Sequence, residues 1–357
     1  MKTLMKNALL PLLVLPVLLL CTCTSQQKPR PSAVSEVPWP AASAESQGLN
    51  AERLDAMREW MRASGRDFRS VIVIRNGMLV MEEYFSSSGR ESRQNVYSCT
   101  KSFLSALFGI AQGESSLPPL DARALPLLPG ADSPGLDERT RLITIEQLLS
   151  MSAGVQAIRA VDMAGARDQV RFALEKPLAS DPGSHFLYTS AGPHLLSSLL
   201  QRSVGMSARE YAARKLFAPL GIQGWSWDVD GTGVTIGSTN LSLTSVDLAK
   251  LGYLFLRNGE WFGTRILPAS WVHEATRTHS RPVGMNRAEN SGYGYLWWVD
   301  EQWGGYSAHG AGGQFVFVVP RLDLVVVFTS ALSFDDFPFP WDLMKDYVLP
   351  AVGDAAP

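Results

Sequence analysis

Strand-forming segments lie near both ends of the 357-residue chain, and helix-forming segments occupy its middle. Near the amino end, Val71 to Ile74 and Met78 to Tyr84 are joined by Asn76-Gly77, a dipeptide typical of a tight hairpin turn. Near the carboxyl end, Gln314 to Pro320 and Leu324 to Thr329 form a second apolar hairpin. This distribution predicts an α+β fold in which one antiparallel sheet is built from both termini.

Predicted helices flank these hairpins and fill the region between them. Asn50 caps a helix that places Leu54, Met57 and Met61 on one face, and an amphipathic segment runs from Trp341 to Leu349. We expect these two helices to flank the sheet. The middle is predicted to be mainly helical, with helices at Ile145 to Met151, Ala191 to Arg202, Ala208 to Phe217 and Ser245 to Arg257.

The folded domain is predicted to span residues 46–353, with a sheet region at about 46–95 and 285–353 and a helical insertion at about 98–280. A hydrophobic content of 46% suffices for a full core. Outside the leader the chain has only Cys99, so the mature domain has no internal disulfide and depends on that core. A cleft between sheet and insertion is the natural place for an active site.

The first residues are typical of an export signal. Lys2 and Lys6 precede an apolar run from Ala8 to Leu20, which predicts a signal peptide over residues 1–23. Leu20-Cys21-Thr22-Cys23 resembles a bacterial lipobox in which Cys23 is lipidated, and plain cleavage nearby is the alternative. Residues 24–45 are predicted to be a flexible linker. We therefore expect a periplasmic protein or a lipoprotein anchored to the membrane through Cys23.

The formal net charge is −2, and Lys and Arg form no dense cluster along the chain. Proteins that bind nucleic acid carry a concentrated basic surface, so nucleic acid is not an expected partner. The His residues form no zinc-site pattern, and Gly231-Thr232-Gly233 lacks the third glycine of a dinucleotide fingerprint. No metal or other cofactor is implied.

Ser98 and Lys101 carry the chemical signal. At this spacing they share one face of a helix, about one turn apart. A serine hydroxyl barely ionises at neutral pH and needs an adjacent base, which a neutral lysine supplies. The apolar run after Lys101 predicts burial, which disfavours its ammonium form. The alternative is a capped helix with a solvated lysine. Cys99 points about 100° away and is interpreted as a small core filler.

Several further segments accompany this pair in a particular order. They are Tyr97 to Ser102, Ile143 to Gly154, Pro182-Gly183 with Tyr188-Thr189-Ser190, Leu243 to Ala249 and Gly294 to Trp298. Together they resemble the serine hydrolases related to class C β-lactamases, D-alanyl-D-alanine carboxypeptidases, family VIII esterases and 6-aminohexanoate-dimer hydrolase. The resemblance covers about residues 45–350 and implies a β-lactamase/transpeptidase-like fold.

The resemblance implies a role for each matching residue. Ser98 looks like the nucleophile, Lys101 looks like its partner, and Tyr188 falls at the tyrosine of the Y-x-N motif, where a phenol shuttles a proton; otherwise Tyr188 is a core residue. Ser190 replaces the asparagine that holds the acyl side chain, which weakens the case for β-lactam recognition. Ser190, Trp297 and Trp298 are candidates for the substrate pocket, with the core as the alternative for the two tryptophans.

The third motif of the family aligns with His309-Gly310-Ala311. The resemblance implies that His309 is a donor near Tyr188 and that the N–H groups of Gly312 and Ser98 form the oxyanion hole. Ala311 replaces the usual glycine, and the lysine that grips a substrate carboxylate is absent.

We therefore expect a serine hydrolase that cleaves a small-molecule carboxylic ester or small amide through an acyl-enzyme. One alternative is a β-lactamase or D-alanyl-D-alanine carboxypeptidase. Another is a binding protein that retains the fold without turnover.

Overall fold

The computed structural model describes residues 39–282 and 291–352, and all structural statements concern these residues. A seven-stranded sheet has the order β2-β1-β12-β11-β10-β9-β8, with antiparallel neighbours throughout. Its strands are β1 (Phe68–Arg75), β2 (Met78–Tyr84), β8 (Ser291–Tyr293), β9 (Trp298–Asp300), β10 (Gly305–Gly310), β11 (Gln314–Val319) and β12 (Leu324–Ser330). Because β1 pairs with β12, both termini build the sheet, as predicted.

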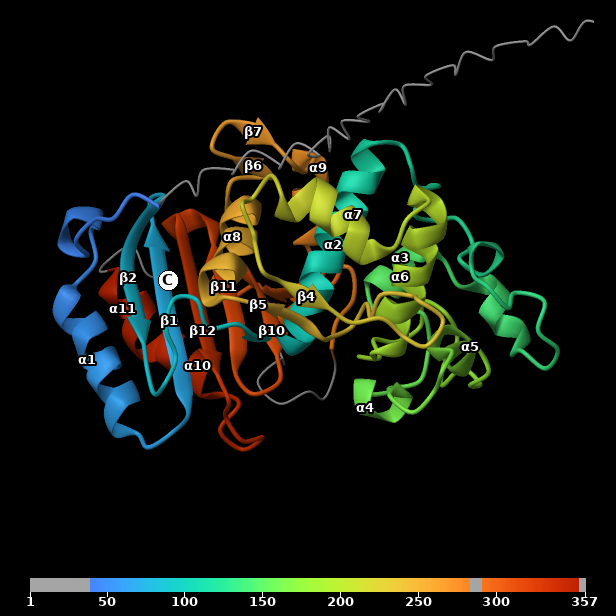
Figure 1. Ribbon diagram of the computed structural model, residues 1–357, viewed down its shortest axis with the longest axis horizontal. Coiled ribbons are helices and arrows are strands. Elements are labelled where there is room, and N and C mark those ends of the chain that lie inside the picture. Colours follow the sequence, from blue (N-terminus) through green and yellow to red (C-terminus); the bar gives the residue numbers. More distant parts are fainter. Residues whose placement is uncertain (1–38, 283–290, 353–357) are drawn as a thin grey trace, which may run out of the picture. The chain divides into compact units, whose positions relative to one another are not determined.

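Helices cover both faces of this sheet (Figure 1). Side chains alternate along β1, so that Val71 and Val73 pack against α1 (Ala51–Ala63), α10 (Phe339–Leu343) and α11 (Leu349–Ala351). Ile72 and Ile74 belong to the larger core on the opposite face, which contains α8 (Ser245–Leu256) and α2 (Thr100–Gly113). Helix α2, which carries Lys101, is therefore buried in this core.

The middle of the chain forms a mainly helical part, whose helices run from green (α3 to α6) through yellow-green (α7) to orange (α9) in Figure 1. Its helices are α3 (Ile145–Leu149), α4 (Ala160–Met163), α5 (Gln169–Leu174), α6 (Ala191–Val204), α7 (Ala208–Ala212) and α9 (Ala269–Ala275). The segment that follows α7, Ala213–Phe217, is a π-helix, as is Met344–Val348 between α10 and α11. The predicted helix from Ile145 ends early, because Met151 adopts a positive φ of 57°.

Two small sheets were not predicted from the sequence. One contains β3 (Gln94–Asn95), β5 (Leu241–Leu243) and β4 (Ser226–Trp227); the other pairs β6 (Glu260–Trp261) with β7 (Thr264–Arg265). Strands of two or three residues are too short to show an alternating apolar pattern. The first sheet matters for function because β3 leads directly into the Ser98 turn.

The predicted linker is too long at its carboxyl end. Trp39 is 8% exposed and its ring contacts the rings of Tyr253 and Trp261. The N–H of Ala42 donates to the carbonyl of Leu79 on the edge strand. These contacts attach residues 39–45 to the domain. The predicted signal peptide and Cys23 lie outside the described residues.

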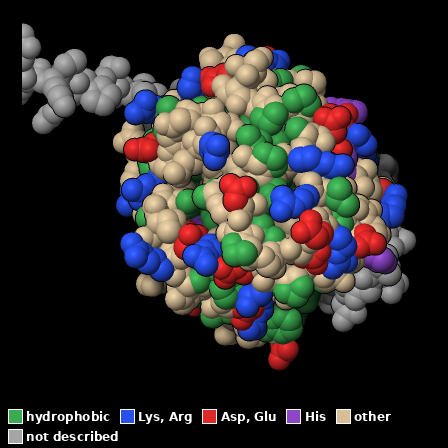
Figure 2. Space-filling model, turned by 90° about the vertical axis from the view of Figure 1, so that its right-hand side faces the viewer, with side chains coloured by type: hydrophobic (Ala, Val, Ile, Leu, Met, Phe, Trp, Pro, Cys, Tyr) green, Lys and Arg blue, Asp and Glu red, His purple; other side chains and the backbone are tan. Residues whose placement is uncertain are grey.

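The face formed by the helical part carries Lys and Arg side chains interspersed with Asp and Glu (Figure 2). No helix in the described ranges combines the length and apolar composition needed to cross a bilayer. Membrane attachment and the absence of a nucleic-acid partner stay predictions.

The packing of α8 on the sheet generates a test. A Cβ atom on Gly252 would lie 2.7 Å from Val316 Cγ1 and 2.8 Å from Val325 Cγ1. Overpacking of this kind costs about 1–3 kcal/mol, whereas alanine gains about 1 kcal/mol of helix propensity. We expect Gly252→Ala to lower the free energy of unfolding by about 1 kcal/mol in urea titrations.

Gly165→Ala is the matched control, because a Cβ there meets no atom within 4 Å. Its free energy of unfolding should change by less than about 0.5 kcal/mol. An unchanged or higher stability for Gly252→Ala would contradict the described contact between α8 and the sheet.

Candidate active site

The Ser98 turn is a short 3-10 helix, Tyr97–Cys99, that joins β3 to α2. Tyr97 adopts a positive φ of 45°, which is unfavourable for a bulky residue. The turn is held because the Tyr97 N–H donates to Asn95 Oδ1 at 2.8 Å and the Cys99 N–H donates to the Val96 carbonyl at 3.1 Å. Strain retained at one residue is common beside functional groups. Cys99 is fully buried behind the turn, as expected for a core filler.

Ser98 and Lys101 are in direct contact. Lys101 Nζ lies 2.7 Å from Ser98 Oγ and donates to the Ser238 carbonyl at 2.9 Å. Lys101 is 1% exposed, and burial lowers the pKa of its ammonium to about 7. The amine is therefore substantially neutral near neutral pH. Sequence reasoning missed Ser238, because a backbone carbonyl that approaches from a distant loop leaves no motif.

Tyr188 reaches the same pair from the loop before α6. Its hydroxyl hydrogen-bonds with Ser98, and its ring centroid lies 5.0 Å from Lys101 Nζ. Burial raises the pKa of the Tyr188 phenol, and the hydrogen bond with Ser98 opposes this rise only in part. The phenol therefore stays protonated at neutral pH. Of the two candidate bases beside Ser98, Lys101 is the one with a pKa suited to accept a proton.

The end of β10 lies against the Ser98 turn. A Cβ on Gly310 would fall 2.3 Å from the Val96 carbonyl oxygen, so only glycine permits this approach. Gly312 and Gly313 follow with φ of 73° and 83°, and Ser330 Oγ donates to their carbonyls. No hydrogen bond joins the N–H of Ser98 or Gly312 to another described residue. These two N–H groups are available to stabilise an oxyanion.

His309 lies at the end of β10 and is linked to Tyr188 through Trp298, which stacks on both rings. On β10, Tyr306 and Ala308 face the core that contains α2, and His309 alternates to the opposite face beside its register partner Phe315. Its Nε2 is 2.7 Å from Ser307 Oγ, and burial lowers its pKa to about 3. His309 is therefore neutral and bonded to Ser307, and no contact joins it directly to Tyr188 among the described residues.

Trp298 lies between these two parts of the site. Its ring stacks on Tyr188 with centroids 5.4 Å apart and on His309 with centroids 5.2 Å apart. Trp297 is fully buried against Phe255 and belongs to the core, which corrects its assignment to the substrate pocket. Neighbouring residues at a strand end point to opposite sides, which explains why Trp297 lies in the core and Trp298 lies in the site.

Ser98 and Tyr188 open into a groove of about 490 Å³. Its further described lining residues are Arg159, Trp298, Val299, Asp300, Ser307, His309, Gly310, Ala311, Gly312, Phe315, Phe334, Phe337, Pro338 and Trp341. Ser190 is not among them; it is 9% exposed at the start of α6. No local pattern indicates that Phe334, Phe337 and Trp341 line the groove, because the return of the chain after β12 brings them there.

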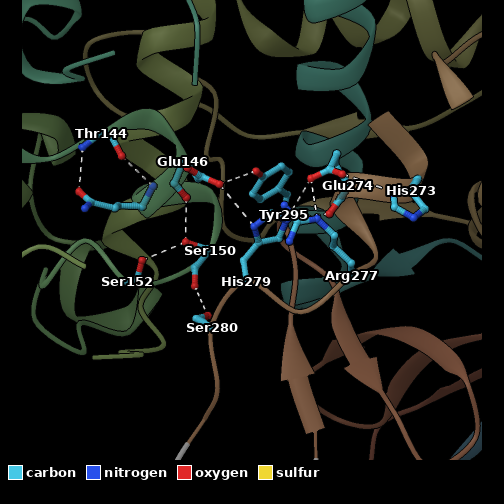
Figure 3. Close-up of polar contacts among 11 residues, drawn as sticks. Thr144, Glu146, Ser150, Ser152, His273, Glu274, Arg277, His279, Ser280 and Tyr295 are labelled. Carbon is cyan, nitrogen blue, oxygen red and sulfur yellow. Dashed lines mark hydrogen bonds and ion pairs between the residues drawn. The ribbon is translucent and has the colours of Figure 1, made fainter. Parts of the chain in front are cut away.

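A polar cluster joins Glu146 on α3 to Tyr295 and His279 (Figure 3). Tyr295 donates its hydroxyl to Glu146 Oε1 at 2.7 Å, and His279 stacks on Tyr295 with ring centroids 4.0 Å apart. Glu146 lies on α3. Met151, which follows this helix, accepts a hydrogen bond at its carbonyl from the N–H of Leu187, the residue before Tyr188. The cluster therefore ties the segment before Tyr188 to the segment before Trp298.

Side chains that ligate metals do not gather elsewhere in the described ranges, where no group of three or more His, Cys, Asp and Glu residues has the geometry to hold an ion. The site therefore contains Ser98, the buried Lys101, the protonated Tyr188 and two backbone N–H groups that bond to no other described residue. This set can perform acyl transfer through a serine.

The chain is similar to several known proteins. The chain is 26% identical over 301 residues to 6-aminohexanoate-dimer hydrolase of Paenarthrobacter ureafaciens, a match that covers 79% of this chain and 76% of that protein. The solved structure of EstCE1, a hydrolase with promiscuous acyltransferase activity, matches with a TM-score of 0.70 and 17% identity, over 85% of this chain and 99% of that one.

The octameric penicillin-binding protein homologue from Pyrococcus abyssi matches with a TM-score of 0.65 and 18% identity, over 79% of this chain and 73% of that one. At these identities the two structural matches establish the β-lactamase/transpeptidase-like fold. The family model of the beta-lactamases matches residues 55–348, which is most of the chain. The chain therefore belongs to the beta-lactamase family.

Proposed function

We propose that this protein is a serine hydrolase that cleaves a carboxylic ester or a small amide through an acyl-enzyme. The observation that carries the proposal is the 2.7 Å contact between Ser98 Oγ and Lys101 Nζ inside the protein. An amine with a pKa of about 7 is matched to the pH at which it must accept a proton. The relatives that are hydrolases support the same chemistry.

The proposed mechanism gives each group one step. Neutral Lys101 takes the proton of Ser98 as the oxygen attacks the carbonyl carbon, and the N–H groups of Ser98 and Gly312 bind the developing oxyanion. Tyr188, whose phenol is protonated, donates to the leaving group and is reprotonated through Lys101. Water then attacks the acyl-enzyme, with the same groups acting in reverse.

A β-lactamase or D-alanyl-D-alanine carboxypeptidase is the alternative enzyme. Both substrate classes carry a carboxylate, and the third motif here offers a neutral His309 bonded to Ser307 in place of a cation. This favours esters and small amides without that carboxylate. A binding protein without turnover is less well supported, because neither altered position, Ser190 or Ala311, interrupts the contact between Lys101 and Ser98.

The first test replaces the nucleophile. We expect the protein to hydrolyse p-nitrophenyl acetate and Ser98→Ala to lower kcat/KM by at least about a thousandfold, because the variant lacks the hydroxyl that contacts Lys101. Ser46→Ala, which alters an exposed serine remote from the groove, is the matched control and should retain activity. Equal turnover by Ser98→Ala would refute the assignment.

A second test separates the three functions. A fluorophosphonate probe should label Ser98 in the folded protein, and nitrocefin turnover should be far slower than ester turnover. Efficient nitrocefin hydrolysis or lasting acylation by penicillin would favour the β-lactamase or peptidase alternative. An inert Ser98 would favour the binding protein.

The third test is the pH dependence of kcat/KM. Since Lys101 acts as a base only when neutral, activity should rise with pH and reach half its plateau at about pH 7. Below that pH the ammonium predominates and the rate falls about tenfold per pH unit. Lys101→Arg keeps a cation that cannot deprotonate, so it should lose at least about a hundredfold in activity. A flat profile between pH 5.5 and 9 would contradict this role.

A further inference from the structure

The groove beyond Ser98 is walled largely by aromatic rings. Trp298 and His309 stack along one side, Phe315 packs against His309 with ring centroids 4.7 Å apart, and Phe337 packs against Phe315 at 5.1 Å. Trp341 lies on α10 and contacts the His309 ring edge-on at 5.8 Å. Burial holds His309 neutral, so this wall presents no ionised side chain.

Two charged residues occur among the described lining residues, and both already have partners. Arg159 forms an ion pair with Asp162, with Nη2 and Oδ1 2.8 Å apart. Asp300 accepts the N–H of Trp303 at 2.9 Å, and burial raises the pKa of its carboxyl. A charged substrate group that entered the groove would lose its hydration without gaining a free counter-ion, which is unfavourable.

Phe334 forms part of the rim of the groove. Its side chain is 94% exposed, the highest value among the exposed large hydrophobic residues of the described ranges. It follows β12 and precedes α10, so it extends the aromatic wall into solvent. A large apolar side chain left in water at the mouth of a groove gains free energy when an apolar ligand covers it.

We propose that this groove binds an uncharged, predominantly apolar chain of the substrate and thereby selects neutral esters over charged esters of equal length. The inference rests on the proposed ester hydrolysis, because Ser98 and Tyr188 lie in the same groove. The chain can belong to the acyl group or to the alcohol, which share this chemistry. The experiment distinguishes the two sources.

The test compares small esters that differ in the length or charge of one chain, with acid release followed in a pH-stat. Ethyl acetate is the short reference, ethyl hexanoate extends the acyl side, and hexyl acetate extends the alcohol side. Monoethyl adipate and ethyl 6-aminohexanoate place an anion or a cation at the end of a six-carbon acyl chain. Four buried methylenes should raise kcat/KM at least about tenfold on the side that occupies the groove.

The charged esters carry the specificity claim. If the acyl chain lies in the groove, both should be cleaved at least about tenfold less efficiently than ethyl hexanoate. If hexyl acetate is the preferred ester, the charged pair is instead 6-acetoxyhexanoate and 6-aminohexyl acetate. Both should then be cleaved at least about tenfold less efficiently than hexyl acetate. Either pattern supports the proposal and assigns the side.

Phe334→Ala tests the rim. The substitution removes an exposed ring on which the fold does not depend. We expect it to lower the preference for the six-carbon ester, measured as its kcat/KM divided by that for ethyl acetate, by about threefold or more. Phe262→Ala is the matched control, because Phe262 is 45% exposed and lies outside the groove. Its ratio should equal that of the unaltered protein.

The outcomes separate the two proposals. If ethyl acetate is cleaved through Ser98 but a charged ester is cleaved as well as its neutral counterpart, the groove proposal is overturned and the proposed function stands. If no ester is cleaved and the fluorophosphonate probe leaves Ser98 unmodified, both fall.

Discussion

The burial of Lys101 is the constraint on which the site depends. An ammonium removed from water is costly, and the free energy is recovered most simply when the group gives up its proton. One acceptor, the carbonyl of Ser238, and one hydroxyl, Ser98 Oγ, satisfy the neutral amine. The same contact that keeps the amine paired places it beside the proposed nucleophile. The hydrogen bonding that satisfies the lysine is therefore also the arrangement by which we propose that the serine is activated.

Several distant segments hold this arrangement in place. Glycine at position 310 lets β10 approach the carbonyl of Val96, which fixes the oxyanion loop beside the Ser98 turn. Ser102 Oγ, one residue beyond Lys101, donates to the Leu296 carbonyl at 2.8 Å, and the N–H of Leu296 donates to the Leu149 carbonyl. Hydrogen bonds therefore join α2 and α3 to the segment that leads into β9. Rigid support of this kind is what a preorganised site requires.

The parts of the structure that local patterns control could be predicted from the sequence. Asn76-Gly77 indicates its hairpin, Asn50 caps α1 through a bond from the Arg53 N–H, and Ser98 meets Lys101 because three residues make about one helical turn. The pairing of β1 with β12 follows from two hairpins that each lack partners. In these cases the determining contacts lie within a few residues or one sheet.

A cleft was expected, but most of its lining could not be predicted, because its walls come from segments that meet only in the folded chain. His309 was expected near Tyr188, yet its ring packs against Phe315, and Trp298 stacks on both His309 and Tyr188. Trp297 and Trp298 cannot be distinguished from the sequence, but Trp297 lies in the core and Trp298 lines the groove. Trp341 was predicted as part of a helix, and its place beside the site depends on how α10 packs on the sheet.

The pKa of Lys101 is the quantity that tests this account most directly. With 13C-labelled lysine, the Lys101 resonance can be assigned by its loss in Lys101→Arg and followed by NMR as pH is varied. We expect a midpoint near 7, far below the ordinary value of 10.5. A midpoint close to 10.5 would show a hydrated ammonium beside Ser98 and would contradict the proposed base.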